Sequence, residues 1–390
     1  MSSINKIFVG GEVHTGKNIL WRLLDGHSSM VSNCMHSNLG YFLLDENCKK
    51  YFLRKRPDFS MQTDSHIQMC KISYNTGEVA TINKGSLLYA LYTFSDYKTF
   101  YSWAKGSSMF VNMTERLNER FPFMFNIKGF EETLEKAMFS GEKVFTEEEV
   151  LDIIYSAYIN NLNDTSSNNK LAQKKYFIDT LANGTLPLST VADKAPGAKI
   201  IIMVRDIESI VYANTIRICG YKGELDGDSS TFKKILYSQY EFENKLRLSF
   251  SVANKLEASN KNVILVNFSD LILNTEKTMK NLAKFIGIEY EPILASPSIN
   301  GKVINSDKYK IIGEINDDPY KLLSEADMDL LWHGIHGFNK QYSILKNLLI
   351  FIRIIRWRIL TIIVKKISKL LKFVLPRGLF FKLKKTINYW

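Results

Sequence analysis

Three short apolar runs mark the chain, and a stretch with helical spacing follows each of them. The runs cover residues 6–10, 199–204 and 262–266 and are typical of strands that are buried on both faces of a sheet. Apolar residues in the stretches between them recur at helical intervals. Strands that alternate with helices predict an α/β fold with a parallel, doubly wound sheet flanked by helices.

The first run leads into a glycine-rich segment, GGEVHTGKN, at residues 10–18. Such sheets bind ligands at the carboxyl ends of their strands. Successive backbone N–H groups in a glycine-rich turn, with a helix N-terminus behind them, favour a phosphate or a sulfate. The expected anion-binding residues are Gly11, Val13, His14, Thr15, Gly16, Lys17, Asn18 and Ile19.

The spacing Gly11-x4-Gly16-Lys17 matches the phosphate-binding loop of P-loop nucleotide hydrolases and kinases. Those enzymes also need a Ser or Thr hydroxyl on magnesium directly after the Lys and an acid at the end of a neighbouring strand. Asn18 supplies no hydroxyl, although Asp206 stands where the acid would be. A small-molecule or nucleotide kinase therefore stays open as an alternative.

The segment between the first two runs has a weaker pattern. Residues 131–162 look helical around a loop, and residues 163–170 form a polar loop. This pattern indicates a mostly helical insertion that shapes an acceptor pocket. We expect one α/β domain over residues 1–340, with the insertion at about 60–195, and a separate tail over 341–390.

Composition limits the class of protein. With 45% apolar residues in 390, the chain is globular. Its four cysteines show neither a metal-ligand spacing nor a disulfide framework, so we expect reduced thiols and no metal site. The N-terminus lacks an apolar stretch of signal-peptide length, so we expect the body of the chain to stay in the cytoplasm.

The tail over 341–390 carries the net charge of the chain. It holds twelve of the 51 Lys and Arg residues and no acid, which leaves 39 basic against 40 acidic residues in the rest. Cations interrupt its apolar runs, so a membrane-spanning helix is not expected. Large apolar and cationic side chains without acids predict a basic amphipathic helix on an anionic membrane surface, at its inner face, rather than a nucleic-acid arm. Packing of this helix on the body or on a partner is the alternative.

The loop and its surroundings resemble the sulfotransferases that use 3'-phosphoadenosine 5'-phosphosulfate, particularly the bacterial carbohydrate-type branch. The first motif of that family runs Gly-x-Pro-Arg-Ser-Gly-Thr-Thr-Leu-Leu, followed by Leu-Leu-Asp-x-His. Residues 11–20 here read GEVHTGKNIL, and residues 23–27 read LLDGH. The resemblance covers about 1–45 and 195–340.

Two later motifs extend the resemblance. Val204-Arg205-Asp206 matches the second family motif, which implies that Arg205 binds the 3'-phosphate of the donor. Ala213 stands where the family has a Ser for the same phosphate, so Ser209 or Asn214 is the substitute. The segment PSINGKVINSDKY at 297–309 is similar to a late family segment near the nucleotide, which makes Gly301 and Lys302 candidates.

The resemblance implies transfer of a sulfuryl group from that donor to a hydroxyl of a glycan or lipid-linked acceptor, without a metal. The catalytic candidates are His14, in the place of the family cation, Lys17, which stands three residues later, and His36. His36 lies near the place of the family's Glu base, and an imidazole titrates near neutrality. A relative that binds nucleotide without turnover is a further alternative.

Overall fold

The computed structural model describes the chain in separate stretches. These stretches are residues 4–32, 39–44, 69–73, 79–83, 127–139, 143–162, 174–181, 184–219, 240–299 and 302–303, with single positions between 313 and 363. The chain divides into two compact units, Met1–Arg205 with Ser249–Ile315, and Asp206–Leu248 with Asn316–Trp390. Each unit is described by itself.

A five-stranded sheet forms the centre of the first unit, in the order β2-β6-β1-β7-β8. Each neighbouring pair in it is parallel. Its strands are β1 (Asn5–Gly11), β2 (Met30–Ser32), β6 (Tyr176–Thr180), β7 (Lys199–Val204) and β8 (Val263–Asn267). The chain runs from β1 to the β6 and β2 side first and only later to the β7 and β8 side. The carboxyl end of β1 is therefore the point where the strand order reverses, which is where open α/β sheets bind ligands.

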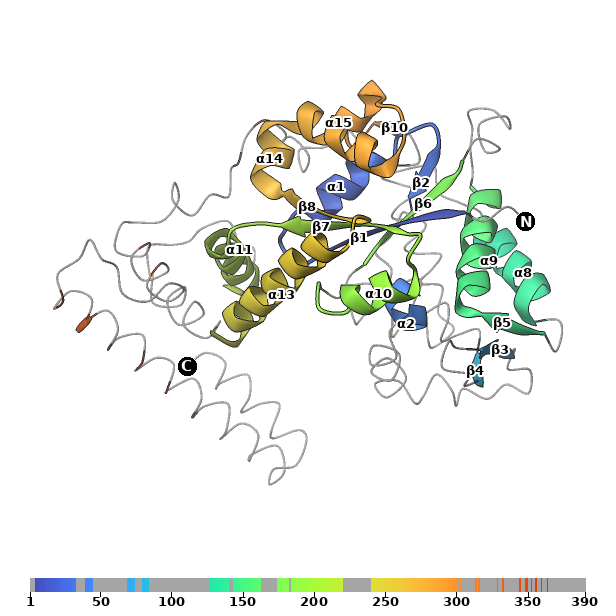
Figure 1. The fold of residues 1–390 in the computed structure, drawn as a ribbon, viewed down its shortest axis with the longest axis horizontal. Helices are drawn as coiled ribbons and strands as arrows, with labels where there is room; N and C mark the ends of the chain where they lie inside the picture. The colour runs from blue at the N-terminus through green and yellow to red at the C-terminus, as the bar shows by residue number, and fades with distance from the viewer. Residues whose placement is uncertain are drawn as a thin grey trace. The chain divides into compact units, whose positions relative to one another are not determined.

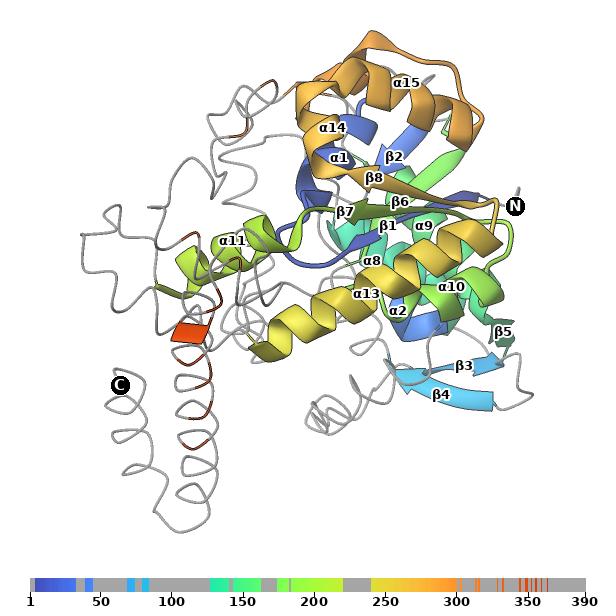
Figure 2. The ribbon, with the colours of Figure 1, turned by 60° about the vertical axis from the view of Figure 1, so that its left-hand side comes forward.

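Helices cover both faces of this sheet (Figure 1). One face carries α1 (Lys17–Leu24), α14 (Phe268–Leu273) and α15 (Thr275–Ile286). The other face carries α2 (Leu39–Leu44), α9 (Glu147–Asn160), α10 (Leu188–Lys194) and the part of α13 (Tyr240–Ser259) that belongs to this unit. Figure 2 shows α10 and the C-terminal part of α13, which belong to this unit, beneath the strands.

Alternation along β1 explains the two layers. Ile7 and Val9 belong to the buried cluster under α1, α14 and α15, whereas Phe8 belongs to the cluster on the opposite face. Successive strand side chains point to opposite faces, so a strand covered on both sides is apolar in its central positions on both faces, as β1 is at Ile7, Phe8 and Val9. The predicted α/β sheet flanked by helices is thus confirmed.

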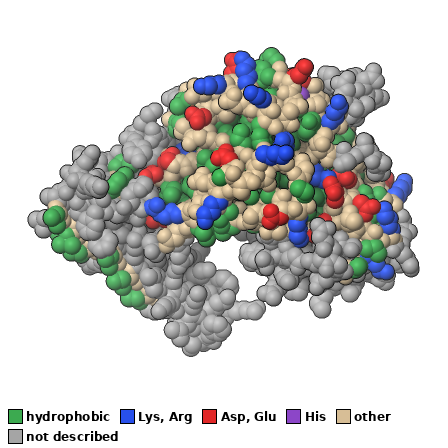
Figure 3. Space-filling model, viewed as in Figure 1, with side chains coloured by type: hydrophobic (Ala, Val, Ile, Leu, Met, Phe, Trp, Pro, Cys, Tyr) green, Lys and Arg blue, Asp and Glu red, His purple; other side chains and the backbone are tan. Residues whose placement is uncertain are grey.

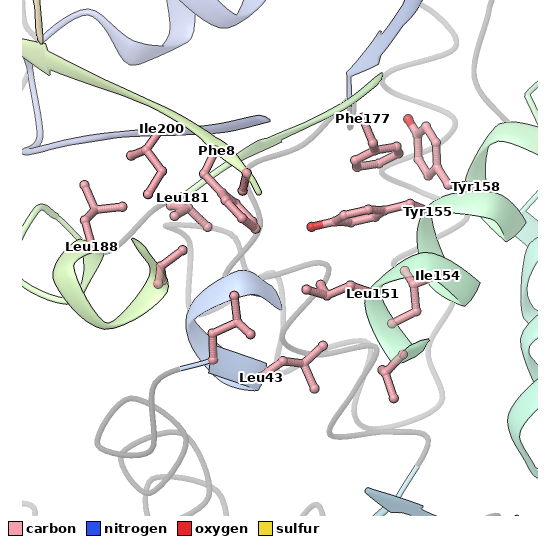
Figure 4. Close-up of a cluster of buried hydrophobic side chains, with 14 of the residues drawn as sticks. Phe8, Leu43, Leu151, Ile154, Tyr155, Tyr158, Phe177, Leu181, Leu188 and Ile200 are labelled. Atoms are coloured by element: carbon pink, nitrogen blue, oxygen red, sulfur yellow. The ribbon is translucent and has the colours of Figure 1, made fainter. Parts of the chain in front are cut away.

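Aromatic packing joins α9 to β6 (Figure 4). The rings of Tyr155 and Phe177 stack with centroids 3.9 Å apart, and Tyr158 meets Phe177 edge-on at 5.4 Å. The Tyr155 hydroxyl donates to Asp179 Oδ2 at 2.9 Å. Burial, and then the charge of Asp179, raise the pKa of Tyr155 well above its ordinary value, so the hydroxyl remains a donor.

A smaller sheet, in the order β4-β3-β5, lies in the region expected as an insertion. Strand β3 (Met69–Ser73) is antiparallel to β4 (Val79–Asn83) and parallel to β5 (Val144–Thr146). The described helical turns beside it are α8 (Ile127–Leu134) and η1 (Glu135–Phe139). Strand β6 of the central sheet also comes from this region, which the apolar pattern did not predict.

The remaining described elements are short, apart from one helix of the second unit. They are η3 (Pro292–Ala295), the antiparallel pair β9 (Ser298–Ile299) and β10 (Lys302–Val303), and α11 (Ile207–Cys219) in the second unit. Among the described residues, no helix is long and apolar enough to cross a membrane. The domain boundaries expected from the sequence remain a prediction.

Candidate functional site

The glycine-rich loop joins β1 to α1 through backbone conformations that few residues adopt. Gly11 and Gly16 have φ values of 132° and 91°, and His14 has a φ of 62°. A Cβ at Gly11 would lie 2.6 Å from the Met203 carbonyl oxygen, and one at Gly16 would lie 2.4 Å from the Phe268 ring. Both glycines are therefore required by sterics as well as by φ.

The loop ends at the N-terminus of α1, where Gly16 is the N-cap and makes no side-chain cap bond. The first turn of α1 holds no acidic residue. Backbone N–H groups and the helix dipole thus favour an anion at this end of the helix. Thr15 Oγ1 donates to the Glu12 carbonyl at 2.7 Å, which fixes the turn from inside.

Lys17 is the first residue of α1 and is largely buried, with 7% of its surface exposed. Its Nζ donates to the carbonyl of Leu181, just after β6, at 2.9 Å. An ammonium carries three donors, and this bond holds the charge beside the loop. Asn18, next in the helix, is exposed.

Arg205 follows β7, the neighbour of β1, and is buried. Its Nη1 donates to the His14 carbonyl at 3.3 Å, and its guanidinium lies 4.3 Å from the centre of the Phe268 ring. The ring limits the guanidinium to one orientation and adds a cation–π attraction. The structure thus brings together the loop, Lys17 and Arg205 at the carboxyl edge of the sheet.

Four other predicted site residues are not joined to this group by the described contacts. Ser209 lies in the second unit, where its backbone N–H donates at 2.7 Å to Asp206 Oδ1, and the Asp206 carboxylate thereby caps α11. Lys302 is described only through its backbone, which pairs with Ile299. His36 and Gly301 lie outside the described residues.

The Leu-Leu-Asp-x-His segment lies at the opposite end of α1 and makes structural bonds. Asp25 accepts from the hydroxyls of Ser32 and Ser298. His27 Nε2 lies 2.8 Å from the Glu289 carbonyl, and its Nδ1 accepts from the Ser29 backbone N–H at 3.1 Å. These bonds hold the C-terminus of α1 to β2 and to the segment after α15.

Two residues of the site were not predicted from the sequence. Phe268 packs against the Arg205 guanidinium. In the sequence, the only sign of this role is that an aromatic residue closely follows the third apolar run. Glu12 is a buried acid inside the glycine-rich loop, and an acid in a segment predicted to bind an anion was the signal that could have singled it out.

A cavity of about 300 Å³ lies along the outer edge of β8 against α14 and α15. Asn267, Asp270 and Lys277 are among its polar lining residues, and none of the loop residues lines it. Within the described stretches, no group of three or more His, Cys, Asp or Glu is placed to hold a metal ion.

The sheet order, the glycine loop at the point of strand reversal and the helices on both faces define an α/β protein of the P-loop type. The model of the sulfotransferase family matches residues 106–292, slightly less than half of the chain. This match confirms the relationship to sulfotransferases that the sequence motifs predicted, and sulfotransferase is the enzyme class that it supports. The matched segment includes Arg205 and ends before Lys302, and it does not include the loop.

The solved structures similar to this chain are sulfotransferases as well. The sulfotransferase domain from the curacin biosynthetic pathway is 13% identical, with 89% of this chain and 96% of that one covered and a TM-score of 0.36. The sulfotransferase domain of the Synechococcus olefin synthase is also 13% identical, with 89% of this chain and 92% of that one covered and a TM-score of 0.33. A sulfotransferase from Mycobacterium tuberculosis is 11% identical, covering 86% and 78%, with a TM-score of 0.33. At these scores the likeness carries no weight for substrate or mechanism. No curated protein matches the chain.

Proposed function

We propose that the chain transfers the sulfuryl group of 3'-phosphoadenosine 5'-phosphosulfate to a hydroxyl of a glycan or lipid-linked acceptor. The observation that carries the proposal is the convergence of the uncapped start of α1, Lys17 and Arg205 at the carboxyl ends of β1 and β7. Two separate cationic positions at one sheet edge suit a ligand with two anionic ends.

In this proposal the loop N–H groups and Lys17 bind the 5'-phosphosulfate, and Arg205 binds the 3'-phosphate. Charge develops on the bridging oxygen of the leaving phosphate as the sulfuryl group departs, and a fixed cation beside it lowers the barrier. His14 lies within the loop and joins this group. His36 remains the proposed base for the acceptor hydroxyl.

Calorimetric titration with 3'-phosphoadenosine 5'-phosphate, and separately with ATP and magnesium, tests the donor. We expect the bisphosphate to bind without metal and Lys17→Ala or Arg205→Ala to weaken it at least tenfold, since a hydrogen bond to a charged group contributes about 1.5–3 kcal/mol. Binding of magnesium-ATP alone would instead indicate the kinase. Binding of neither ligand would favour the alternative of a relative without turnover.

Matched controls for these variants lie at the far end of α1. Lys174 also donates to backbone carbonyls, those of His27 and Met30. Arg22 is buried and lies over the Trp21 ring at 3.6 Å. Lys174→Ala and Arg22→Ala should alter thermal stability and leave the bisphosphate affinity of the folded fraction within about threefold.

We further propose that residues 341–390 lie on the inner, anionic surface of a membrane and bring the enzyme to a lipid-linked acceptor. Seven described helical positions in this tail are large, aliphatic and exposed, at Ile344, Leu348, Leu349, Ile352, Ile355, Ile359 and Ile363. Their spacing places them on one side of a helix. A surface of this kind gains free energy when lipid covers it, and the all-cationic charge of the tail favours anionic headgroups.

Vesicle sedimentation tests this association. The intact chain should bind vesicles that contain phosphatidylserine more tightly than vesicles of phosphatidylcholine, and added salt should weaken the difference. The double variant Ile352→Glu with Ile355→Glu should abolish binding. Leu273→Glu is the control, because Leu273 is 54% exposed in α14, outside the tail. Equal sedimentation of the double variant and the intact chain would contradict the proposal.

A further inference from the structure

The loop that is proposed to bind the anionic donor contains a buried acid. Glu12 follows Gly11 directly, and only 1% of its surface is exposed. Burial of a carboxylate is costly unless other groups donate hydrogen bonds to it. A buried acid at this place therefore needs a reason in the contacts around it.

Two elements of the same unit donate to one oxygen of this carboxylate. The Thr185 backbone N–H donates to Glu12 Oε1 at 3.1 Å, and Ser249 Oγ, from α13, donates to it at 2.7 Å. The Gly184 backbone packs against the same group, because a Cβ there would lie 2.6 Å from Oε1. Glu12 thus ties the loop to α13 and to the connection between β6 and α10.

A second bond joins the two segments. It links the start of the connection, at Leu181, to Lys17, which follows the loop at the first position of α1. Leu181 accepts from Lys17 Nζ at 2.9 Å. Glu12 and Lys17, which are five positions apart in the sequence, therefore hydrogen-bond to the same connection. Glu12 accepts from Thr185, and Lys17 donates to Leu181. The Leu181 carbonyl thus helps to fix the position of the Lys17 ammonium.

We infer that Glu12 is a positioning residue, which holds Lys17 at the donor site through the connection between β6 and α10. The inference rests on the proposed function in that Lys17 is taken to bind the donor. Lysine is a point charge on a flexible four-carbon stem, so fixing its carbonyl partner reduces the entropy that is lost when the donor binds. The protein's own fold then supplies the preorganisation that electrostatic catalysis needs.

Amide hydrogen exchange tests the tie without any ligand. Glu12→Ala and Lys17→Ala should each speed exchange of the Thr185 amide and its neighbours, because both bonds hold this connection. Glu12→Gln keeps an acceptor oxygen of the same size and should exchange like the wild type. Ser298→Ala is the matched control, since Ser298 is a buried hydroxyl at the far end of α1. Unchanged exchange at Thr185 in Glu12→Ala would overturn the inference.

A double-mutant cycle on bisphosphate affinity tests the route through Lys17. We expect Glu12→Ala to weaken 3'-phosphoadenosine 5'-phosphate about tenfold in the wild type and less than about twofold in a Lys17→Ala background. Glu12→Gln should stay within about threefold of the wild type, because the hydrogen bonds and not the charge do the positioning. An equal loss in both backgrounds would show that Glu12 does not act through Lys17.

The two measurements separate this inference from the proposed function. If the wild-type protein does not bind the bisphosphate, the proposed donor is wrong, and hydrogen exchange alone still decides whether Glu12 and Lys17 hold the connection. If the bisphosphate binds and Thr185 exchanges alike in all variants, the donor proposal stands and the role of Glu12 is rejected.

Discussion

At the scale of single residues, the site depends on backbone positions as much as on charges. Gly16 permits the left-handed turn before α1, and the Phe268 ring occupies the space where a side chain would be. The same ring carries Arg205. One aromatic side chain therefore links the shape of the loop to the orientation of the second cation.

Gly16→Ala should consequently damage both stability and donor binding. The strained φ costs about 1–3 kcal/mol, and the added methyl displaces Phe268 and with it the Arg205 guanidinium. Chemical denaturation and bisphosphate titration measure the two effects. Gly197→Ala is the control, since nothing lies within 4 Å of a Cβ at that position. Equal affinities in the two variants would contradict the coupling through Phe268.

The sequence predicted the motif of the loop, but it did not predict which residues contact that motif in the folded chain. The spacing of Gly11, Gly16 and Lys17 identified the loop, because a phosphate-binding turn needs those residue types at that spacing. The contact of Lys17 with Leu181 could not be predicted, since the two residues are 164 positions apart. The roles assigned to the site residues remain predictions.

At the scale of elements, the residues at the ends of helix α15 show how far capping can be predicted from the sequence. Helix α15 ends at Gly287, which adopts the left-handed conformation at φ 89° and is the residue type that most often ends a helix. Asn274 lies at its N-cap position without a side-chain cap bond, whereas Thr275 Oγ1 donates to the Leu271 carbonyl at 2.7 Å. Local capping chemistry is readable from sequence, but the exact bond depends on the preceding helix.

Helix α9 carries a capping box, which yields a prediction for stability and its pH dependence. Thr146 Oγ1 accepts from the Glu149 N–H at 3.1 Å, and Glu149 Oε2 accepts from the Thr146 N–H at 2.8 Å. Thr146→Ala should lower the free energy of unfolding by about 1 kcal/mol. Because α9 packs on β6, the loss should appear in the unfolding of the first unit.

The pH dependence follows from the sign of the shift at Glu149. The Thr146 backbone N–H, and then Lys143, hold the pKa of Glu149 below its ordinary value. The charged form is thus favoured by folding, so its contribution is present above the ordinary glutamate pKa of about 4.3 and is lost as the pH falls through the lowered folded pKa. Glu149→Gln should be less stable than wild type near pH 7 and equal to it at strongly acidic pH. A constant difference between the two proteins in urea denaturation would refute this origin.

At the scale of the whole molecule, the charge of the chain is divided between a balanced body and a cationic tail. On the face shown in Figure 3, described Lys and Arg side chains are interspersed with Asp and Glu. The excess of +11 arises from residues 341–390. The proposed binding to an anionic surface therefore belongs to that segment and not to the balanced body.

The sequence by itself determined the α/β class, the three strands that lead to the site, the glycine-rich loop after the first strand and the placement of charge in the tail. These features follow from local periodicity, from the φ that glycine permits and from composition. Only the tertiary structure decided the strand order, the membership of β6 in the central sheet, the stacking of Arg205 on Phe268 and the bonds of Glu12. Each of these joins segments that are distant in sequence, and such contacts are fixed by how the apolar faces pack around one sheet.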